Sequence, residues 1–266
     1  MGAKTSELLR IVMFGAGNVA FQLTKSLTEL GHTVVQIVSR TEANAKSLAE
    51  IAHCDFTTDI RNVRLDADLY IMCVSDSVIS ELTKNLPKLQ GIVVHTSGST
   101  SIKVLSGVSD TYGVFYPFQT FTKGRDAELA QVPFCLEASN TKTYQILQQL
   151  VVSLKGTPVE MDSKQRQILH LTGVFSCNFS NHMFAISQLL TQEYDLDFSL
   201  LAPLIRETVE KALKGNPIDS QTGPAIRGDS ETLKKHMALL SEIDEDLRDL
   251  YLSVSNSILN FKHYND

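Results

Sequence analysis

The sequence LLRIVMFGAGNVA, residues 8–20, decides the fold because it joins an apolar run to a glycine turn and the start of a helix. The run before the glycines is almost entirely apolar, which is typical of a strand buried on both faces of a parallel sheet. Gly15 and Gly17 begin a G-x-G-x-x-G/A turn that ends at Ala20. The stretch therefore predicts the first βαβ unit of a dinucleotide-binding fold.

Each small residue of this turn has a physical role. Gly15 allows the tight turn out of the strand, Gly17 has no Cβ in the way of a pyrophosphate, and Ala20 lets the helix pack closely on the strand. The helix predicted over residues 18–30 directs free N–H groups and the positive end of its dipole toward the phosphates. We expect the turn to bind the cofactor through Gly15, Ala16, Gly17, Asn18 and Val19.

The composition is that of an ordinary globular protein. Of its 266 residues, 43% are hydrophobic and 20% are charged, and the net charge is −6. That charge predicts no nucleic-acid or membrane partner, and no apolar stretch is long enough to cross a bilayer. The amino terminus lacks a signal-peptide core, and the four cysteines form no CxxC pair. We therefore expect reduced thiols and a cytoplasmic protein.

The end of the second strand, predicted over residues 33–38, bears on the choice of cofactor. Ser39, Arg40 and Thr41 stand where an NAD-binding fold usually has Asp or Glu. A guanidinium and two hydroxyls can hold a 2′-phosphate that a carboxylate would repel, so we expect NADP. In the alternative, Ser39 or Thr41 caps the helix over residues 42–51 and Arg40 is solvated.

Two further strands end in polar residues that are candidates for the same site. Val74, Ser75 and Asp76 follow a buried strand, and ligands of open α/β sheets bind at the carboxyl ends of the strands. We therefore expect all three beside the cofactor, although Asp76 is equally well suited to cap the next helix.

The strand predicted over residues 92–95 opens into the loop HTSGS. A loop of hydroxyls and glycine lets the backbone approach a nicotinamide or a substrate carboxylate, so we expect Thr96 and Ser97 to line the site. His95 titrates near neutrality and is a candidate for proton transfer. In the alternative, His95 is a buried structural histidine bonded to the backbone.

Strands alternate with helices in the first part of the chain, and only helices follow. The alternation predicts a Rossmann-like, doubly wound α/β domain over residues 1–162, with a sheet of roughly eight strands. Residues 163–266 predict an all-α domain whose first helix, capped by Ser163, extends to about residue 192. Because that helix is apolar on much of its circumference, we expect a homodimer through the helical domain.

Polar residues within this apolar helix are further candidates, since burying one unpaired costs about 1–3 kcal/mol. His170 and Asn178 are offset by about 80° around an α-helix, so both can face one cleft. In the alternative, they satisfy helix–helix contacts, or His170 lies at a dimer seam. No metal-ligand spacing is present, because His170 and His182 are not an i, i+4 pair and no HExxH occurs.

The segment TGPAIRGD, residues 222–229, has the composition of an ordered turn. Arg227 can bind a substrate carboxylate through two parallel hydrogen bonds. In the alternative, Arg227 forms an internal ion pair with Asp229.

Taken together, the GAGNVA turn, SRT, HTSGS, the YP turn, the histidine–asparagine helix and GPAIRGD resemble a known group. They resemble the Rossmann-like NADP oxidoreductases with a C-terminal helical domain of unknown function. That group is similar in architecture to 6-phosphogluconate dehydrogenase, pyrroline-5-carboxylate reductase and ketopantoate reductase. The resemblance covers nearly the whole chain and implies NADP binding and a dimer-forming helical domain.

The layout HTSGSTSIK followed by VFYPFQ is also similar to prephenate dehydrogenase-like enzymes, with Tyr116 where that family has a histidine. Hydroxy-acid dehydrogenases have lysine four residues before the asparagine of the long helix, and this chain has Val174 there.

The expected function is therefore that of an NADP-dependent oxidoreductase acting on a small, carboxylate-bearing substrate. His170 or His95 handles the proton, and Asn178 and Arg227 orient the substrate. The alternatives are a non-catalytic dinucleotide sensor or scaffold, a prephenate dehydrogenase-like enzyme, and a deazaflavin-linked reductase.

Overall fold

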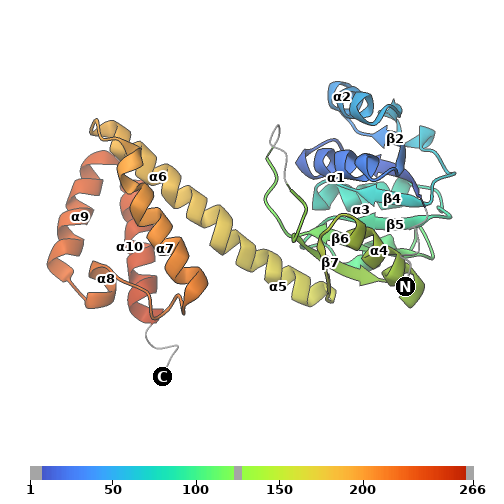
Figure 1. Ribbon diagram of the computed structural model, residues 1–266. Coiled ribbons are helices and arrows are strands. Elements are labelled where there is room, and N and C mark those ends of the chain that lie inside the picture. Colours follow the sequence, from blue (N-terminus) through green and yellow to red (C-terminus); the bar gives the residue numbers. More distant parts are fainter. Residues whose placement is uncertain (1–7, 123–127, 262–266) are drawn as a thin grey trace. The chain divides into compact units, whose positions relative to one another are not determined.

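The computed structural model describes residues 8–122 and 128–261, which divide into two compact units at residues 180 and 181 (Figure 1). The first unit contains β1 (Arg10–Phe14), α1 (Asn18–Glu29), β2 (Thr33–Val38), α2 (Glu42–Ala52), β3 (Asp55–Thr57), η1 (Ile60–Asn62), β4 (Leu69–Met72), α3 (Asp76–Asn85), β5 (Ile92–His95), η2 (Ile102–Leu105), β6 (Tyr112–Pro117), β7 (Pro133–Ala138), α4 (Thr141–Ser153), β8 (Thr157–Glu160), α5 (Ser163–Gly173) and η3 (Val174–Phe179). The following elements are α6 (Ser180–Glu193), η4 (Phe198–Leu201), α7 (Ala202–Lys214), α8 (Pro224–Arg227), α9 (Ser230–Ile243) and α10 (Glu245–Asn260).

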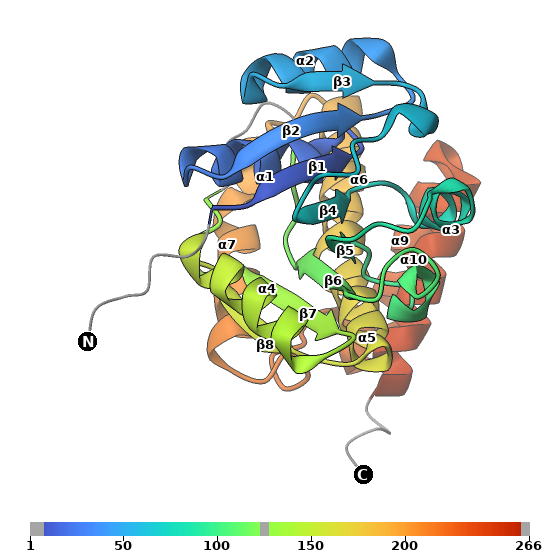
Figure 2. The same cartoon turned by 90° about the vertical axis from the view of Figure 1, so that its right-hand side faces the viewer.

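The first unit is built on an eight-stranded sheet in the order β3-β2-β1-β4-β5-β6-β7-β8, which Figure 2 shows from top to bottom. Ile11 and Met13 of β1 face a core that contains residues of α1, α2 and α4. Val12 and Phe14 face a second core that contains residues of α3 and η2. The apolar run at the start of the chain is therefore buried on both faces, as the sequence predicts.

The expectation of a Rossmann-like doubly wound domain is confirmed, with one departure in the sheet. The strands from β3 to β6 pair in parallel, whereas β6 pairs antiparallel with β7. β8 then pairs in parallel with β7. The sheet is therefore mixed, because the alternation of elements in the sequence does not specify the direction of each strand.

The long helix that follows the sheet differs from the prediction at its start and in its middle. Asp162, not Ser163, is the N-cap, and it forms a capping box with Gln165. The helix is continuous, but Val174–Phe179 is a π-helical segment between α5 and α6. The compact unit that contains the sheet extends through Ser180, so it includes the first part of this helix.

The second unit is helical, as expected, and buries few of its own apolar side chains. Among its described residues, Ala225 is the only hydrophobic one that is buried. α8 is a short helix that begins at Pro224, where the sequence predicts only a turn. None of the helices within the described ranges is both long and apolar enough to cross a membrane.

Candidate cofactor pocket and active site

The glycine turn between β1 and α1 has the geometry that its sequence predicts. Gly15 has φ +99°, and a Cβ there would overlap the backbone carbonyl oxygen of Cys73. A Cβ on Gly17 would meet no atom within 4 Å, so the space in front of this residue is open. Gly17 is also the N-cap of α1, where it has no side chain to cap the helix. The turn therefore leaves an open cradle at a helix N-terminus, which suits a diphosphate.

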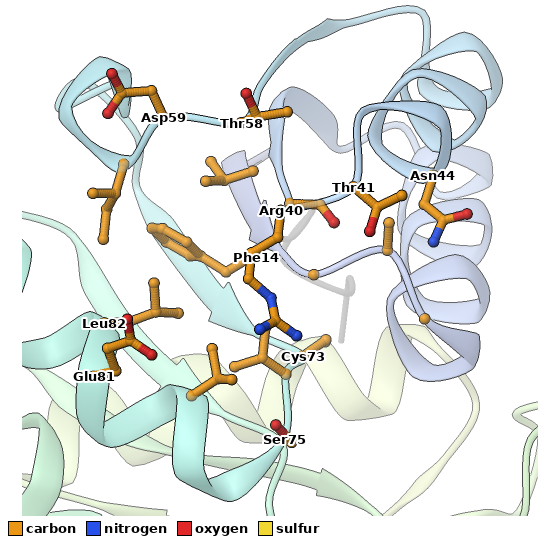
Figure 3. Close-up of a pocket in the computed structure, with 18 of the residues that line it drawn as sticks. Phe14, Arg40, Thr41, Asn44, Thr58, Asp59, Cys73, Ser75, Glu81 and Leu82 are labelled. Carbon is orange, nitrogen blue, oxygen red and sulfur yellow. The ribbon is translucent and has the colours of Figure 1, made fainter.

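A cavity of about 530 Å³ opens from this turn along the carboxyl ends of β1, β2 and β4 (Figure 3). Its volume is in the range of small-molecule and cofactor sites. The lining includes eight of the predicted cofactor residues: Gly15, Ala16, Gly17, Ser39, Arg40, Thr41, Val74 and Ser75. It also includes Asn44, Thr58, Asp59 and Glu81, which lie outside the sequence motifs.

Of the lining residues within the described ranges, Arg40 is the only cationic one. Its side chain extends into the cavity toward Ser75 in Figure 3, and it forms no ion pair within the described part of the chain. Thr41 occupies the N-cap position of α2, but its hydroxyl does not cap the helix. Both polar groups are therefore available to a ligand.

The carboxylate of Asp59 is also in this lining, but Arg61 holds it. Arg61 Nη2 lies 2.7 Å from Asp59 Oδ2, and this hydrogen bond is the main cause of a pKa of about 2 for Asp59. Arg61 therefore compensates the negative charge of Asp59 locally.

Two predicted cofactor residues on α1 lie outside the cavity lining. The Asn18 side chain donates a hydrogen bond from Nδ2 to the carbonyl oxygen of Phe121, at 2.8 Å. Val19 is partly buried and packs against the larger core. Their roles toward a cofactor remain predictions based on the sequence pattern.

The loop after β5 uses much of its polar capacity to hold its own shape. Ser97 is buried, and its hydroxyl accepts the backbone N–H groups of Ser99 and Thr100 at 3.1 and 2.9 Å. Thr96 donates its hydroxyl to the carbonyl oxygen of Met72 at 3.3 Å. Neither Thr96 nor Ser97 is among the residues that line the cavity, and both hydroxyls form hydrogen bonds within the protein. The contacts predicted for them with a ligand stay predictions.

Asp76 is the first residue of α3, so the alternative that it caps this helix is wrong. The N-cap position belongs to Ser75, whose side chain makes no capping hydrogen bond. The carboxylate of Asp76 accepts a hydrogen bond from the hydroxyl of Ser99. Because Ser75 lines the cavity and Asp76 is its neighbour, this bond joins the cavity to the HTSGS loop.

His95 is fully buried in the sheet, which matches the alternative of a structural histidine. Its Nδ1 accepts the backbone N–H of Ser97 at 3.2 Å. Burial, with a smaller contribution from the positive charge of Arg166, lowers the pKa of His95 to about 4. The ring is therefore neutral near pH 7 and closed off from solvent.

His170 lies directly over the HTSGS loop and is exposed. A Cβ on Gly98 would come within 2.6 Å of His170 Cγ, so only glycine allows this approach. The Nδ1 of His170 lies 3.0 Å from the hydroxyl oxygen of Tyr116 at the end of β6. The structure thus brings together His170, the predicted loop and Tyr116 of the YP turn.

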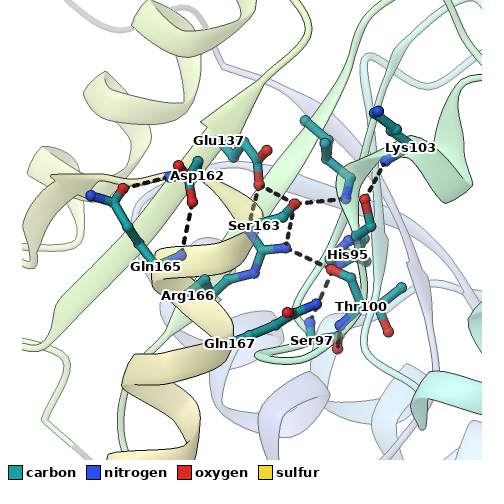
Figure 4. A network of polar contacts seen from close by, with 12 residues as sticks. His95, Ser97, Thr100, Lys103, Glu137, Asp162, Ser163, Gln165, Arg166 and Gln167 are labelled. Carbon is teal, nitrogen blue, oxygen red and sulfur yellow. Dashed lines mark hydrogen bonds and ion pairs between the residues drawn. The ribbon is translucent and has the colours of Figure 1, made fainter.

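Arg166, which belongs to none of the sequence motifs, anchors α5 to the sheet (Figure 4). This side chain is fully buried, and its Nη1 lies 2.5 Å from Glu137 Oε2 on β7. Its Nη2 donates to the carbonyl oxygen of Thr100 at 2.6 Å and to the hydroxyl of Ser163 at 3.2 Å. One signal was present in the sequence, because Arg166 is one helical turn before His170 and shares its face.

Asn178 is exposed and lies in the π-helical segment Val174–Phe179. A π turn closes through i→i+5 bonds, so each residue advances the helix by a smaller angle than in an α-helix. The offset of about 80° calculated from α-helical geometry for His170 and Asn178 therefore does not hold. A smaller advance per residue over this segment reduces the offset, which favours His170 and Asn178 facing the same side of the helix.

Arg227 belongs to the second unit, where it is the last residue of α8 and is exposed. Arg227 forms no salt bridge with Asp229 within the described residues, and its positive charge contributes only after the hydrogen bonds with Thr232 to the lowered pKa of Asp229. Asp229 instead caps α9 through the backbone N–H of Thr232 at 3.1 Å. Arg227 thus remains available to a ligand.

The sheet topology, the open glycine cradle and the polar pocket at the carboxyl strand ends define a Rossmann-like dinucleotide-binding protein. Residues 10–97 match a family model described as "NADP oxidoreductase coenzyme F420-dependent", and residues 132–258 match "Domain of unknown function (DUF2520)". A protein of Bacteroides fragilis, provisionally assigned as an NADP oxidoreductase, is 39% identical, with a TM-score of 0.89 over 95% of this chain and 98% of that one. The chain belongs to this NADP oxidoreductase family.

More distant solved structures share the fold. A reductive aminase from Aspergillus terreus, in complex with NADPH and ethyl-5-oxohexanoate, is 15% identical, with a TM-score of 0.73 over 96% of this chain and 94% of that one. A 1-pyrroline-5-carboxylate reductase from Streptococcus pyogenes is 14% identical, with a TM-score of 0.61 over 95% and 97% of the two chains. None of the curated proteins matches the chain in sequence.

Proposed function

We propose that this protein is an NADP-dependent oxidoreductase that transfers hydride between the nicotinamide and a small, carboxylate-bearing substrate. The main support is the cavity at the glycine turn, where the space in front of Gly17 is open and Arg40 is the only cation among the described lining residues. The cofactor supplies the hydride, and the protein supplies binding, orientation and proton transfer.

The preference for NADP over NAD rests on the groups around the start of α2. Arg40, Thr41 and Asn44 line the cavity beside Ser39 at the end of β2. A guanidinium with neighbouring hydroxyl and amide groups is the donor set that a phosphate monoester needs. We infer that these residues bind the 2′-phosphate.

Roles at the substrate follow from the chemistry of the remaining polar groups. His170 handles a proton, Asn178 donates or accepts a hydrogen bond, and Arg227 binds a substrate carboxylate through its guanidinium.

A titration that follows the fluorescence of NADPH, with NADH in parallel, tests the proposed cofactor. The chain has no tryptophan, so the emission of the cofactor itself is the signal. Replacing Arg40 with alanine removes charge-assisted hydrogen bonds worth about 1.5–3 kcal/mol, which corresponds to a 10- to 150-fold loss of NADPH affinity. NADH affinity stays within about threefold, since NADH lacks the 2′-phosphate that these bonds hold.

The matched control is Lys46→Ala, which removes a positive charge from α2, the helix that follows Arg40, at an exposed position outside the cavity lining. It leaves the affinity for both coenzymes unchanged. If wild-type protein binds NADH as tightly as NADPH, the assignment of the 2′-phosphate site is wrong. If it binds neither at millimolar concentration, the proposed function fails.

A second candidate function has support from the family model over residues 10–97, which is described by its coenzyme F420 dependence. In this reaction NADPH and a deazaflavin exchange a hydride. Mixing the protein with NADPH and coenzyme F420 tests it directly, because reduction of the deazaflavin bleaches its absorbance. Bleaching without any other acceptor favours this reaction, and its absence leaves the small-substrate reaction.

We also propose that the protein is a homodimer through its helical domain. The second unit exposes the following large apolar side chains: Leu189, Tyr194, Leu196, Leu200, Leu204, Val209, Leu213, Ile218, Leu239, Leu252, Val254, Leu259 and Phe261. Since this unit buries little apolar surface by itself, a second copy with the same apolar surface is the expected cover.

Sedimentation equilibrium at micromolar concentration tests this assembly. Leu213→Lys places a charge at the most exposed of these positions, 82% exposed, and is expected to weaken the dimer. Val152→Lys, at a side chain in the first unit that is 59% exposed, is the control. A monomeric wild-type protein at this concentration would refute the proposal.

A further inference from the structure

Tyr116 and His170 form a hydrogen-bonded pair that neither the family nor the cofactor pocket accounts for. The Tyr116 hydroxyl oxygen lies 3.0 Å from His170 Nδ1, and the two rings meet edge to face with centroids 6.0 Å apart. The pair joins β6 to α5, which are far apart in the sequence. Gly98 lies against the imidazole, so the pair stands over the HTSGS loop.

The position of this pair relative to the cavity follows from the strand order. Ser75, after β4, lines the cavity, and β5 and β6 are the next two strands in the sheet. Asp76, after β4, bonds to Ser99, after β5, and Tyr116 lies at the end of β6, so these groups lie along the carboxyl ends of three neighbouring parallel strands. A dinucleotide that extends along the carboxyl ends of β2, β1 and β4 places its reactive end toward this edge.

We propose that the hydroxyl of Tyr116 donates the proton in the reaction and that His170 replaces it. This proposal rests on the proposed function. As NADPH supplies a hydride to the carbon of a C=O or C=N bond, the oxygen or nitrogen takes the proton of the Tyr116 hydroxyl. The phenolate oxygen takes the Nδ1 proton of a doubly protonated His170, which leaves a neutral imidazole with its proton on Nε2. Solvent then returns one proton to the ring.

The surroundings of the two groups suit these roles. Burial, aided by the charge of Asp76 and by Cys135, raises the pKa of Tyr116 to about 12 against the opposing effect of Arg166. The hydroxyl is therefore protonated near pH 7 and holds the proton that the proposed step transfers. The histidine ring is exposed to solvent on α5, so it exchanges protons with water directly. The pair thus connects a half-buried acid to bulk solvent.

Nuclear magnetic resonance of 15N-labelled histidine tests the pair without any substrate. In the wild type we expect neutral His170 to carry its proton on Nε2, because Tyr116 donates to Nδ1. Tyr116→Phe removes this bond and shifts the tautomer balance, whereas Tyr112→Phe on the same strand does not. His170→Gln assigns the signals.

The same spectra test whether the pair lies beside the nicotinamide. Saturation with NADPH is expected to move the ring signals of His170. The ring signals of His32 are expected not to move, because this histidine lies at the amino ends of β1 and β2, where its Nδ1 accepts the Leu9 N–H. If NADPH saturates the protein and the His170 signals do not move, the proposal is overturned while the proposed function stands. If NADPH does not bind, the proposed function fails, and with it this assignment.

Turnover provides the second readout, with pyruvate, 2-oxoglutarate and 1-pyrroline as probe acceptors. Tyr116→Phe is expected to lower kcat by about 100-fold or more, the usual contribution of a positioned acid, with the Kd for NADPH within twofold of wild type. Tyr112→Phe retains wild-type kcat. If Tyr116→Phe also retains it, Tyr116 is not the donor. If no probe reacts, the His170 spectra with and without NADPH decide.

Discussion

Replacing Arg166 with methionine tests the contact network that holds α5 against the sheet. The substitution keeps an unbranched apolar stem, but it removes the contacts of the guanidinium with Glu137, Thr100 and Ser163. The Glu137 carboxylate, which is 19% exposed, then keeps only the hydroxyl of Ser163, 2.8 Å away. Because breaking a buried ion pair leaves an uncompensated charge, the expected loss is about 3–5 kcal/mol in the free energy of unfolding.

Urea unfolding followed by circular dichroism measures this loss, since the chain has no tryptophan for fluorescence. Arg64→Met is the matched control, because Arg64 pairs with Asp66 at the surface, where such a pair contributes about 0–1 kcal/mol. In the double variant Arg166→Met and Glu137→Gln, both charges are absent. We expect it to be more stable than the sum of the two single losses by about 1–3 kcal/mol.

Two results would refute this reasoning. A loss below about 1 kcal/mol for Arg166→Met would mean that water or a neighbouring group compensates Glu137. Strictly additive effects in the double variant would mean that the two side chains do not interact across the contact of 2.5 Å.

Three further predictions concern Gly17, Gly98 and His95. The Cβ of Gly17→Ala meets no protein atom within 4 Å, so this variant is expected to unfold in urea as the wild type does. Because the Cβ fills the diphosphate cradle, we expect the variant to bind NADPH at least about tenfold more weakly, and equal affinity in a fluorescence titration would contradict this. Gly98→Ala places a Cβ 2.6 Å from His170 Cγ, so it is expected to lower the free energy of unfolding by about 1–3 kcal/mol and to disturb the Tyr116–His170 hydrogen bond. Gly107→Ala, whose Cβ meets no atom within 4 Å, is expected to lower it far less, and the urea midpoints of the two variants test this difference. The pKa of His95 is lowered from 6.5 to about 4, so the unfolded chain binds a proton at this residue more readily than the folded chain does. The contribution of His95 to the free energy of unfolding therefore falls by about 3 kcal/mol as the pH decreases from about 6.5 to about 4. Asp59 and Asp66, with pKa values of about 2, titrate below this window, and His95→Gln is expected to flatten the slope within it.

Much of the fold is determined locally, and the sequence was sufficient for it. The strand at Thr33–Val38 and the strand at Ile92–His95 have the bounds that their apolar runs predict. The glycine turn also follows from its own residues, since Gly15 and Gly17 are required by backbone conformation and close approach. Hydrophobic periodicity and turn chemistry act over a few residues, so strands and turns of this kind can be predicted from the sequence.

The remaining features depend on which distant segments meet. Nothing within β7 specifies that it runs antiparallel to β6, and nothing near His95 in the sequence indicates that its side chain is fully buried. Of the two histidines proposed for proton transfer, the sequence could not distinguish the buried His95 from the exposed His170. The bond from His170 to Tyr116 spans 54 positions of the chain, so it exists only after α5 packs on the loop.

The amino-acid sequence by itself determined the nucleotide-binding turn, the order of strands and helices and the change to an all-helical second half. Tertiary structure alone decided which charges are buried together, as in the contact between Arg166 and Glu137, and which proton-carrying groups reach solvent. The physical reason is that helix and strand patterns arise from neighbouring residues, whereas burial and pairing of polar groups depend on contacts between segments far apart in the chain.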